Sequence, residues 1–377
     1  MNRKEIAEIR RRFNPDKNAI SCIRGCYVSE KGEVVAAFNR PLMSFPMEEQ
    51  EKYLSIFKRT LAGAPGRNLI DIEFRPDQVM ADDAHGLLMG LRNTALTVDQ
   101  GVEKLCRKII DSLDMEGNYL ILMLHDAYDV PFRHVDEHKV DVVSEEVFSY
   151  IMVSVCPVKL TKPALSYFSE DNAFHSREPD WVVAAPELGF MFPTFDDRAT
   201  NIYAALYYTR DAADIHEEFI EAVFNADAPM PAAEQKETFQ AVLEDALEDD
   251  LSLDVVQAVH DTLRERLEEH DRDKTAEPLE LGRREVVNLL ESCGVPEEKL
   301  QAFEEKYDAE FGEAVSLPAR NVVEPKKFEV RTPDVVVHVN PERSDLIQTR
   351  VIDGVKYVLI RAEEGVEVNG VNINIGE

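Results

Sequence analysis

The chain has 377 residues, 44% of them hydrophobic, and its 73 acidic against 42 basic residues give a net charge of −31. This length predicts two or three domains, and the hydrophobic content excludes a disordered chain. The negative charge disfavours binding of the whole surface to nucleic acid or to anionic membranes, because both would repel it.

Residues 1–210 predict a mixed domain. We expect an N-terminal helix, then a hairpin of Ile20–Tyr27 and Val34–Phe38. Helical periodicity follows at 47–62, 80–93 and 98–113. Apolar strands are expected at Tyr119–Leu124 and Val147–Val158, with shorter ones around 165–168, 181–184 and 202–208. Successive strands without helices between them indicate largely antiparallel pairing, and so an α+β fold class.

Residues 211–315 predict an acidic helical domain, and residues 320–377 a small β-hairpin domain. Positions 211–310 contain 30 acidic and 9 basic residues. Gly294 and Pro296 are typical of the end of one helix and the first turn of the next. Asp353-Gly354 and Asn369-Gly370 predict two tight hairpins, because these dipeptides accept positive φ at both turn positions.

A candidate metal site follows the strand Tyr119–Leu124. His125, Asp126 and Asp129 lie where this strand is expected to end, and three further residues of the same types follow at His134, Asp136 and His138. His and Asp at short spacing suit zinc or a harder divalent metal. This site would make the protein a metal-dependent enzyme, such as a hydrolase. The competing interpretation is a strand end followed by a solvated polar loop, because the spacing matches no metalloenzyme motif.

A candidate partner-binding segment surrounds the single tryptophan. Trp181 precedes Phe190, Phe192 and Phe195, and these precede the charged run Asp196–Arg198. Aromatic side chains beside charges are typical of a ligand or partner groove. The interpretation that we prefer is a loop whose aromatic side chains cover the core.

The five cysteines and the missing secretion signal predict reduced thiols in a cytoplasmic protein. Cys22 and Cys26 share one face of the first strand, which leaves open a redox or metal role, although isolated thiols mostly behave as small hydrophobic residues. The longest apolar run, Tyr119–Leu124, is too short to span a membrane.

Two basic or helical segments raise the question of DNA binding. Val286–Tyr307 resembles a helix-turn-helix, but its second helix is rich in glutamate, so we prefer an αα-hairpin that serves packing. The N-terminal helix is basic and would touch nucleic acid or pair with the protein's own acidic helices. We prefer the second interpretation for its five cations, Arg3, Lys4, Arg10, Arg11 and Arg12.

Common catalytic signatures are absent from the sequence. It contains no Gly-rich phosphate loop, no dinucleotide-binding glycine pattern, no His-Glu-x-x-His and no nucleophile elbow. These absences favour a protein without cofactors that is not an enzyme.

The whole chain resembles a bacterial family of unknown function, DUF4317. The resemblance rests on seven stretches, Met1–Arg10, Gly25–Val28, His125–Pro131, Cys156–Val158, Gly294–Glu298, Thr332–Val337 and Asn340–Arg343. It implies no reaction and no site residue. The order of parts is also similar to that of bacterial nucleoid-associated proteins. We therefore expect a cytoplasmic interaction protein that binds protein partners, especially basic ones, and that reaches the nucleoid through them.

Overall fold

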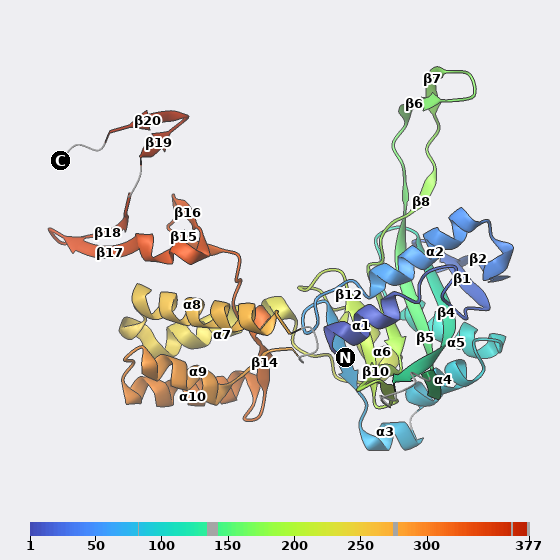
Figure 1. Ribbon diagram of the computed structural model, residues 1–377, viewed down its shortest axis with the longest axis horizontal. Coiled ribbons are helices and arrows are strands. Elements are labelled where there is room, and N and C mark those ends of the chain that lie inside the picture. Colours follow the sequence, from blue (N-terminus) through green and yellow to red (C-terminus); the bar gives the residue numbers. More distant parts are fainter. Residues whose placement is uncertain (82, 134–141, 274–277, 363–364, 375–377) are drawn as a thin grey trace. The chain divides into compact units, whose positions relative to one another are not determined.

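The computed structural model describes residues 1–377 except 82, 134–141, 274–277, 363–364 and 375–377. The described chain forms two compact units, Met1–Ala232 and the combination of Ala233–Asp273 with Pro278–Glu377 (Figure 1). Among the described residues, no helix has both the length and the apolar character needed to cross a membrane.

The first unit is built on one antiparallel sheet. Its strand order is β2-β1-β4-β5-β9-β12-β3, and each pair of neighbours runs antiparallel. The strands are β1 (Cys22–Val28), β2 (Val34–Pro41), β3 (Leu69–Glu73), β4 (Tyr119–Arg133), β5 (Val142–Leu160), β9 (Leu188–Phe192) and β12 (Ala204–Thr209). A small hairpin follows β9, formed by β10 (Thr194–Asp196) and β11 (Ala199–Asn201).

Helices cover both faces of this sheet, so its central strands are apolar on both sides. In β4, Ile121 and Met123 belong to the first core, whereas Leu120 and Leu122 belong to the second. The first core lies under α4 (Asp83–Asn93), α5 (Asp99–Asp111) and α6 (Glu217–Phe224). The second core lies under α1 (Arg3–Arg10) and α2 (Met47–Thr60). The short helix α3 (Pro76–Ala81) precedes α4.

The second unit combines helices with hairpins. Its core is formed mainly by α7 (Ala232–Leu247), α8 (Leu253–His270), α9 (Arg283–Ser292), α10 (Glu297–Phe311) and α11 (Ala319–Val322). Two short strands pair beside them, β13 (Glu280–Gly282) and β14 (Ser316–Pro318). Three hairpins follow, β15 (Phe328–Arg331) with β16 (Val336–Val339), β17 (Ile347–Ile352) with β18 (Val355–Ile360), and β19 (Val366–Val368) with β20 (Val371–Ile373).

The α+β class and the largely antiparallel sheet are confirmed. Both predicted hairpin turns form, with positive φ at Asp353-Gly354 and at Asn369-Gly370. The unit boundary differs from the predicted one at residue 210. Helix α6 belongs to the first unit, because Phe219, Ile220, Val223 and Phe224 are buried in the first core.

The predicted helical and β-hairpin domains form one unit rather than two. A 3-10 helix of the hairpin part, Pro341–Leu346, contacts α8. The Gln257 side chain of α8 donates to the Ser344 carbonyl across 2.8 Å, and the Ser344 hydroxyl donates to Asp261 across 2.9 Å. These contacts bind the start of the β17–β18 hairpin to α8.

Candidate functional site

The predicted metal residues lie within a strand and not after one. Strand β4 continues to Arg133, so the prediction that it ends at Leu124 is wrong. The alternation of side chains explains the extension, since Tyr128 and Val130 pack on the second core. The same alternation places His125 and Asp126 on opposite faces of the sheet, while Asp129 is exposed.

His125 lies on the face of the first core. Its Nε2 is 2.8 Å from the Ser149 hydroxyl of the neighbouring strand β5. Burial lowers the pKa of His125, the Asp126 charge works in the opposite direction, and Arg92 lowers it further. The neutral imidazole is therefore favoured.

Asp126 is fully buried on the other face, and protein donors surround its carboxylate. Arg12 donates from Nε and Nη2 across 3.0 Å each, the Ala19 amide donates across 2.8 Å, and the Tyr150 hydroxyl donates across 3.0 Å. Burial and the Asp126 charge raise the pKa of Tyr150 well above its ordinary value, which keeps this hydroxyl a donor. Asp126 thus anchors the N-terminal segment on the sheet.

The structure does not bring the predicted ligands together. Within the described part of the chain, no group of three His, Cys, Asp or Glu side chains is placed to hold a metal ion. His134, Asp136 and His138 lie outside the described residues. The metal-dependent enzyme remains a prediction that rests on the sequence.

The four aromatic candidates also separate. Phe190 and Phe192 are buried in the first core and Phe195 in the second, each at most 1% exposed. This burial agrees with the interpretation of core-covering aromatics for the three phenylalanines. Trp181 is different, because it is 57% exposed and lies on another strand, β8 (Trp181–Val183). The four side chains therefore form no common groove.

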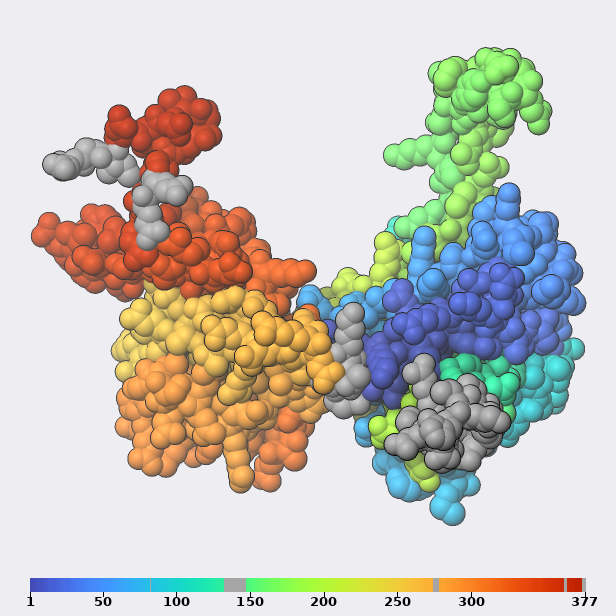
Figure 2. Space-filling model, viewed as in Figure 1, coloured from blue at the N-terminus to red at the C-terminus, as the bar shows by residue number. Residues whose placement is uncertain are grey.

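Trp181 belongs to a projecting ribbon, residues 160–183, that we call the arm (Figure 2). Strand β5 pairs with β8 at its base, from Val158↔Val183 to Leu160↔Trp181. Beyond the base, β6 (Ala164–Phe168) pairs with β7 (Ala173–Arg177). Eight large apolar side chains of the arm are exposed, namely Leu160, Leu165, Tyr167, Phe168, Phe174, Trp181, Val182 and Val183.

The outer part of the arm has one apolar face. Register pairs Tyr167 with Phe174, and their ring centroids are 5.4 Å apart. Leu165 shares this face by strand alternation and is 76% exposed, while Phe174 is 69% exposed. The opposite face carries Ser166, His175 and Phe168. His175 bonds to Asp171 across 2.5 Å, and its ring centroid lies 5.6 Å from that of Phe168. The arm therefore presents one mainly apolar face and one mixed face, on which Phe168 lies beside polar side chains.

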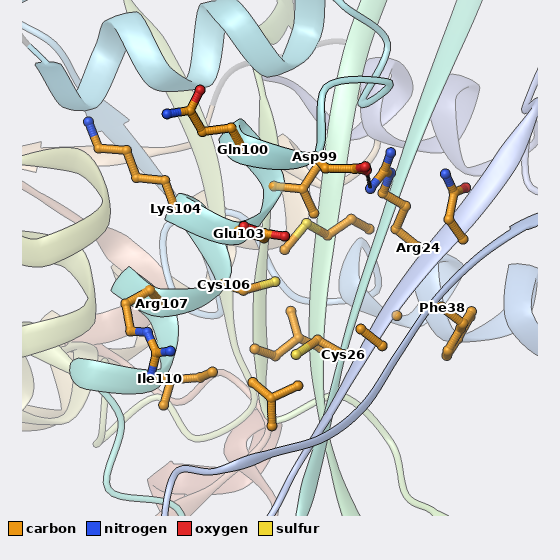
Figure 3. A pocket seen from close by; sticks show the side chains of 17 residues that line it. Arg24, Cys26, Phe38, Asp99, Gln100, Glu103, Lys104, Cys106, Arg107 and Ile110 are labelled. Atoms are coloured by element: carbon orange, nitrogen blue, oxygen red, sulfur yellow. Dashed lines mark hydrogen bonds and ion pairs between the residues drawn. The ribbon is translucent and has the colours of Figure 1, made fainter.

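A pocket of about 700 Å³ lies elsewhere in the first unit, between the β1–β2 strands and α5 (Figure 3). Cys26 of β1 and Cys106 of α5 both line it, together with Arg24 and Arg107. Gly25 is required beside it, because a Cβ there would lie 2.1 Å from the Phe38 ring of β2. Cys22, which shares a strand face with Cys26 by sequence spacing, does not line this pocket. Cys106 is recognised as a neighbour of Cys26 only from the fold, because no spacing in the sequence indicates it.

Residues 1–371 match the sequence pattern of a domain of unknown function, DUF4317. The chain belongs to the DUF4317 family. Among curated proteins, none matches it.

Three cations of the segments that raised the question of DNA binding form ion pairs within this DUF4317 chain. Lys299 and Lys306 of α10 pair with Glu248 and Asp245 across 2.6 and 3.6 Å. Helices α9 and α10 pack on the core of the second unit, as an αα-hairpin does. Arg12 pairs with Asp126 of the sheet, whereas the sequence had suggested the acidic helices as its partner.

Proposed function

We propose that this DUF4317 protein is a non-catalytic interaction protein and that the arm contacts its protein partner. The exposed apolar face formed by Leu165, Tyr167 and Phe174 carries the proposal. Large exposed apolar patches are typical of protein-binding surfaces, since water would otherwise remain in contact with them. Aromatic side chains are also enriched among the residues that dominate binding energy.

The local structure of the arm supports the same role. An isolated two-stranded ribbon is only marginally stable in water. Among the residues that the structure describes, no helix packs on the β6–β7 pair, and its side chains outside Ala173 and Ser166 are exposed. A partner would supply the missing contacts, either by covering the apolar face or by pairing with a strand edge.

The acidic region predicts the charge of that partner. Nine cations cannot neutralise the thirty carboxylates of residues 211–310, and several of these cations already form ion pairs. Such an excess of negative charge attracts a basic protein and accelerates its encounter. A basic DNA-binding protein fits this description. We further propose that the chain associates with the nucleoid through such a protein.

Capture of nucleoid proteins by the full-length chain tests the proposal. A Leu165→Ser/Phe174→Ser variant removes two of the three side chains of the apolar face, and Ser166→Ala/His175→Ala changes the opposite face as a matched control. We expect the first variant to lose about tenfold or more of the captured basic protein, equivalent to about 1.4 kcal/mol. The control should retain capture.

Two further conditions sharpen this experiment. Nuclease treatment of the extract should leave capture intact, because the contact is with protein. Raising salt from about 0.05 to about 0.5 M should weaken capture, since the Debye length shortens several-fold. Equal capture by the Leu165/Phe174 variant, or capture lost with the nucleic acid, would contradict the proposal.

A further inference from the structure

The pocket beside α5 contains two thiols that come from distant parts of the sequence. Cys26 is 5% exposed on β1, and Cys106 is half-buried on α5. Both side chains point into the pocket in Figure 3. This pair is separate from the arm and does not depend on the proposed function.

Charged side chains surround these thiols. The Arg24 guanidinium is buried, donating to Asp99 across 2.7 Å and to the Thr97 carbonyl across 3.3 Å. Its Nε has no hydrogen-bond partner among the described residues. Lys104 and Arg107 are exposed at the rim with Glu103, so the pocket wall carries three cations and two carboxylates. A cationic surrounding stabilises a thiolate and attracts an anionic reagent.

The two thiols are not equivalent. A hydrogen bond from the Cys106 thiol lowers the pKa of Cys26, burial works against this, and Arg107 lowers the pKa further. The same hydrogen bond and burial raise the pKa of Cys106. Cys26 therefore has the greater thiolate character and reacts first, and Cys106 is the thiol that reacts second.

We propose that Cys26 and Cys106 form a dithiol site that exchanges with small disulfides bearing carboxylates. The Cys26 thiolate attacks one sulfur of the reagent, and a mixed disulfide forms as the first thiolate leaves. Cys106 loses its proton and attacks the Cys26 sulfur, and the second thiolate leaves. The two leaving groups take up the two thiol protons. The cysteines are oxidised to one disulfide, and the reagent is reduced to two thiols.

The competing roles predict different products. Two thiols that only fill the core would stay unreactive in the folded protein. Two unconnected reactive thiols would each keep a mixed disulfide.

The experiment uses the full chain with Cys22→Ser and Cys293→Ser, and the probe is 5,5′-dithiobis(2-nitrobenzoate), a disulfide with two carboxylates. We expect two thionitrobenzoates to be released for each chain, and a mass lower by about 2 Da from the two lost thiol hydrogens. Non-reducing peptide maps should contain the Cys26–Cys106 linkage. With Cys106→Ser, one thionitrobenzoate should remain bound at Cys26; with Cys26→Ser, Cys106 should react at least about tenfold more slowly.

A comparison of two probes tests whether the cations at the rim of the pocket favour carboxylates. Lys104→Gln/Arg107→Gln should slow the dicarboxylate probe several-fold more than the neutral probe 4,4′-dithiodipyridine. A stable adduct on the parent chain without the Cys26–Cys106 linkage would overturn the dithiol site, and so would thiols that react only after unfolding. Equal slowing of both probes would overturn the preference for carboxylates. The decisive product forms on the chain that carries only Cys22→Ser and Cys293→Ser. Poor folding of the Cys26→Ser or Cys106→Ser variant therefore leaves the test intact.

Discussion

Arg12 donates hydrogen bonds from Nε and Nη2 to the two carboxylate oxygens of Asp126, each across 3.0 Å. The two residues are 114 positions apart, and Asp126 is fully buried. Arg12 also donates to the Ala127 carbonyl across 3.0 Å. The segment after α1 is therefore fixed to the middle of the sheet by one guanidinium.

Arg12→Met should destabilise the first unit. Removal of the cation leaves a buried carboxylate with only the Ala19 amide and the Tyr150 hydroxyl as donors, at a cost of about 3 kcal/mol. Hydrogen exchange of the β4 amides measures this local free energy. Arg11→Met, at an exposed position, is the control and should change exchange little. Unchanged protection in the Arg12 variant would contradict the anchor.

The sequence pattern predicted the elements better than their partners. Apolar runs and turn dipeptides located the central strands, most helices and the C-terminal hairpins. Strand order and the pairing of Arg12 with Asp126 depend on contacts between distant residues, which no local period encodes. The extension of β4 through His125–Arg133 was missed because polar residues alternate with Tyr128 and Val130, and the polar ones suggested a loop.

The candidate site was predictable only in part. Trp181 is exposed, but Phe190 and its neighbours fill the cores, because β9 lies between β5 and β12. Cys106 joins Cys26 only through the packing of α5 over β1. The arm carried short strand signals at 165–168 and 181–184. No local sequence pattern indicated that its apolar face would stay exposed to solvent.

Gly189→Ala should destabilise the sheet. A Cβ at this position of β9 would lie 2.4 Å from the Val153 carbonyl oxygen and 2.7 Å from Thr60 Cγ2 of α2. The backbone oxygen cannot move without disturbing the ladder, so we expect a cost of about 3 kcal/mol. Gly86→Ala is the matched control, because nothing lies within 4 Å of that helical position, and it should stabilise by about 0.5–1 kcal/mol. Chemical denaturation measures both, and equal effects would contradict the close approach of α2.

Acidification should destabilise the first unit through His125. Its pKa is lowered in the fold, so the unfolded chain binds the proton more readily. The stabilising contribution is complete above the ordinary value of about 6.5 and is lost as pH falls toward the lower folded value. His125→Gln should reduce the fall in melting temperature between about pH 7 and about pH 5. The same slope in the variant would show that another group is responsible.

Trp181 provides a native reporter for the arm. It is the single tryptophan and is 57% exposed, so the emission of the folded protein should be red-shifted and readily quenched by acrylamide. Addition of the captured partner should shift emission to the blue and reduce quenching, because the indole loses contact with water. Emission that is already blue and protected in the isolated protein would show that the arm is covered.

Site-specific photo-crosslinking in cells tests the arm most directly. A benzoylphenylalanine replaces Phe174 on the apolar face, or His175 on the opposite face, in the full-length chain. The interaction proposal predicts a discrete crosslinked protein from position 174 and little or none from 175. Equal crosslinking from the two faces, or none from either, would contradict it.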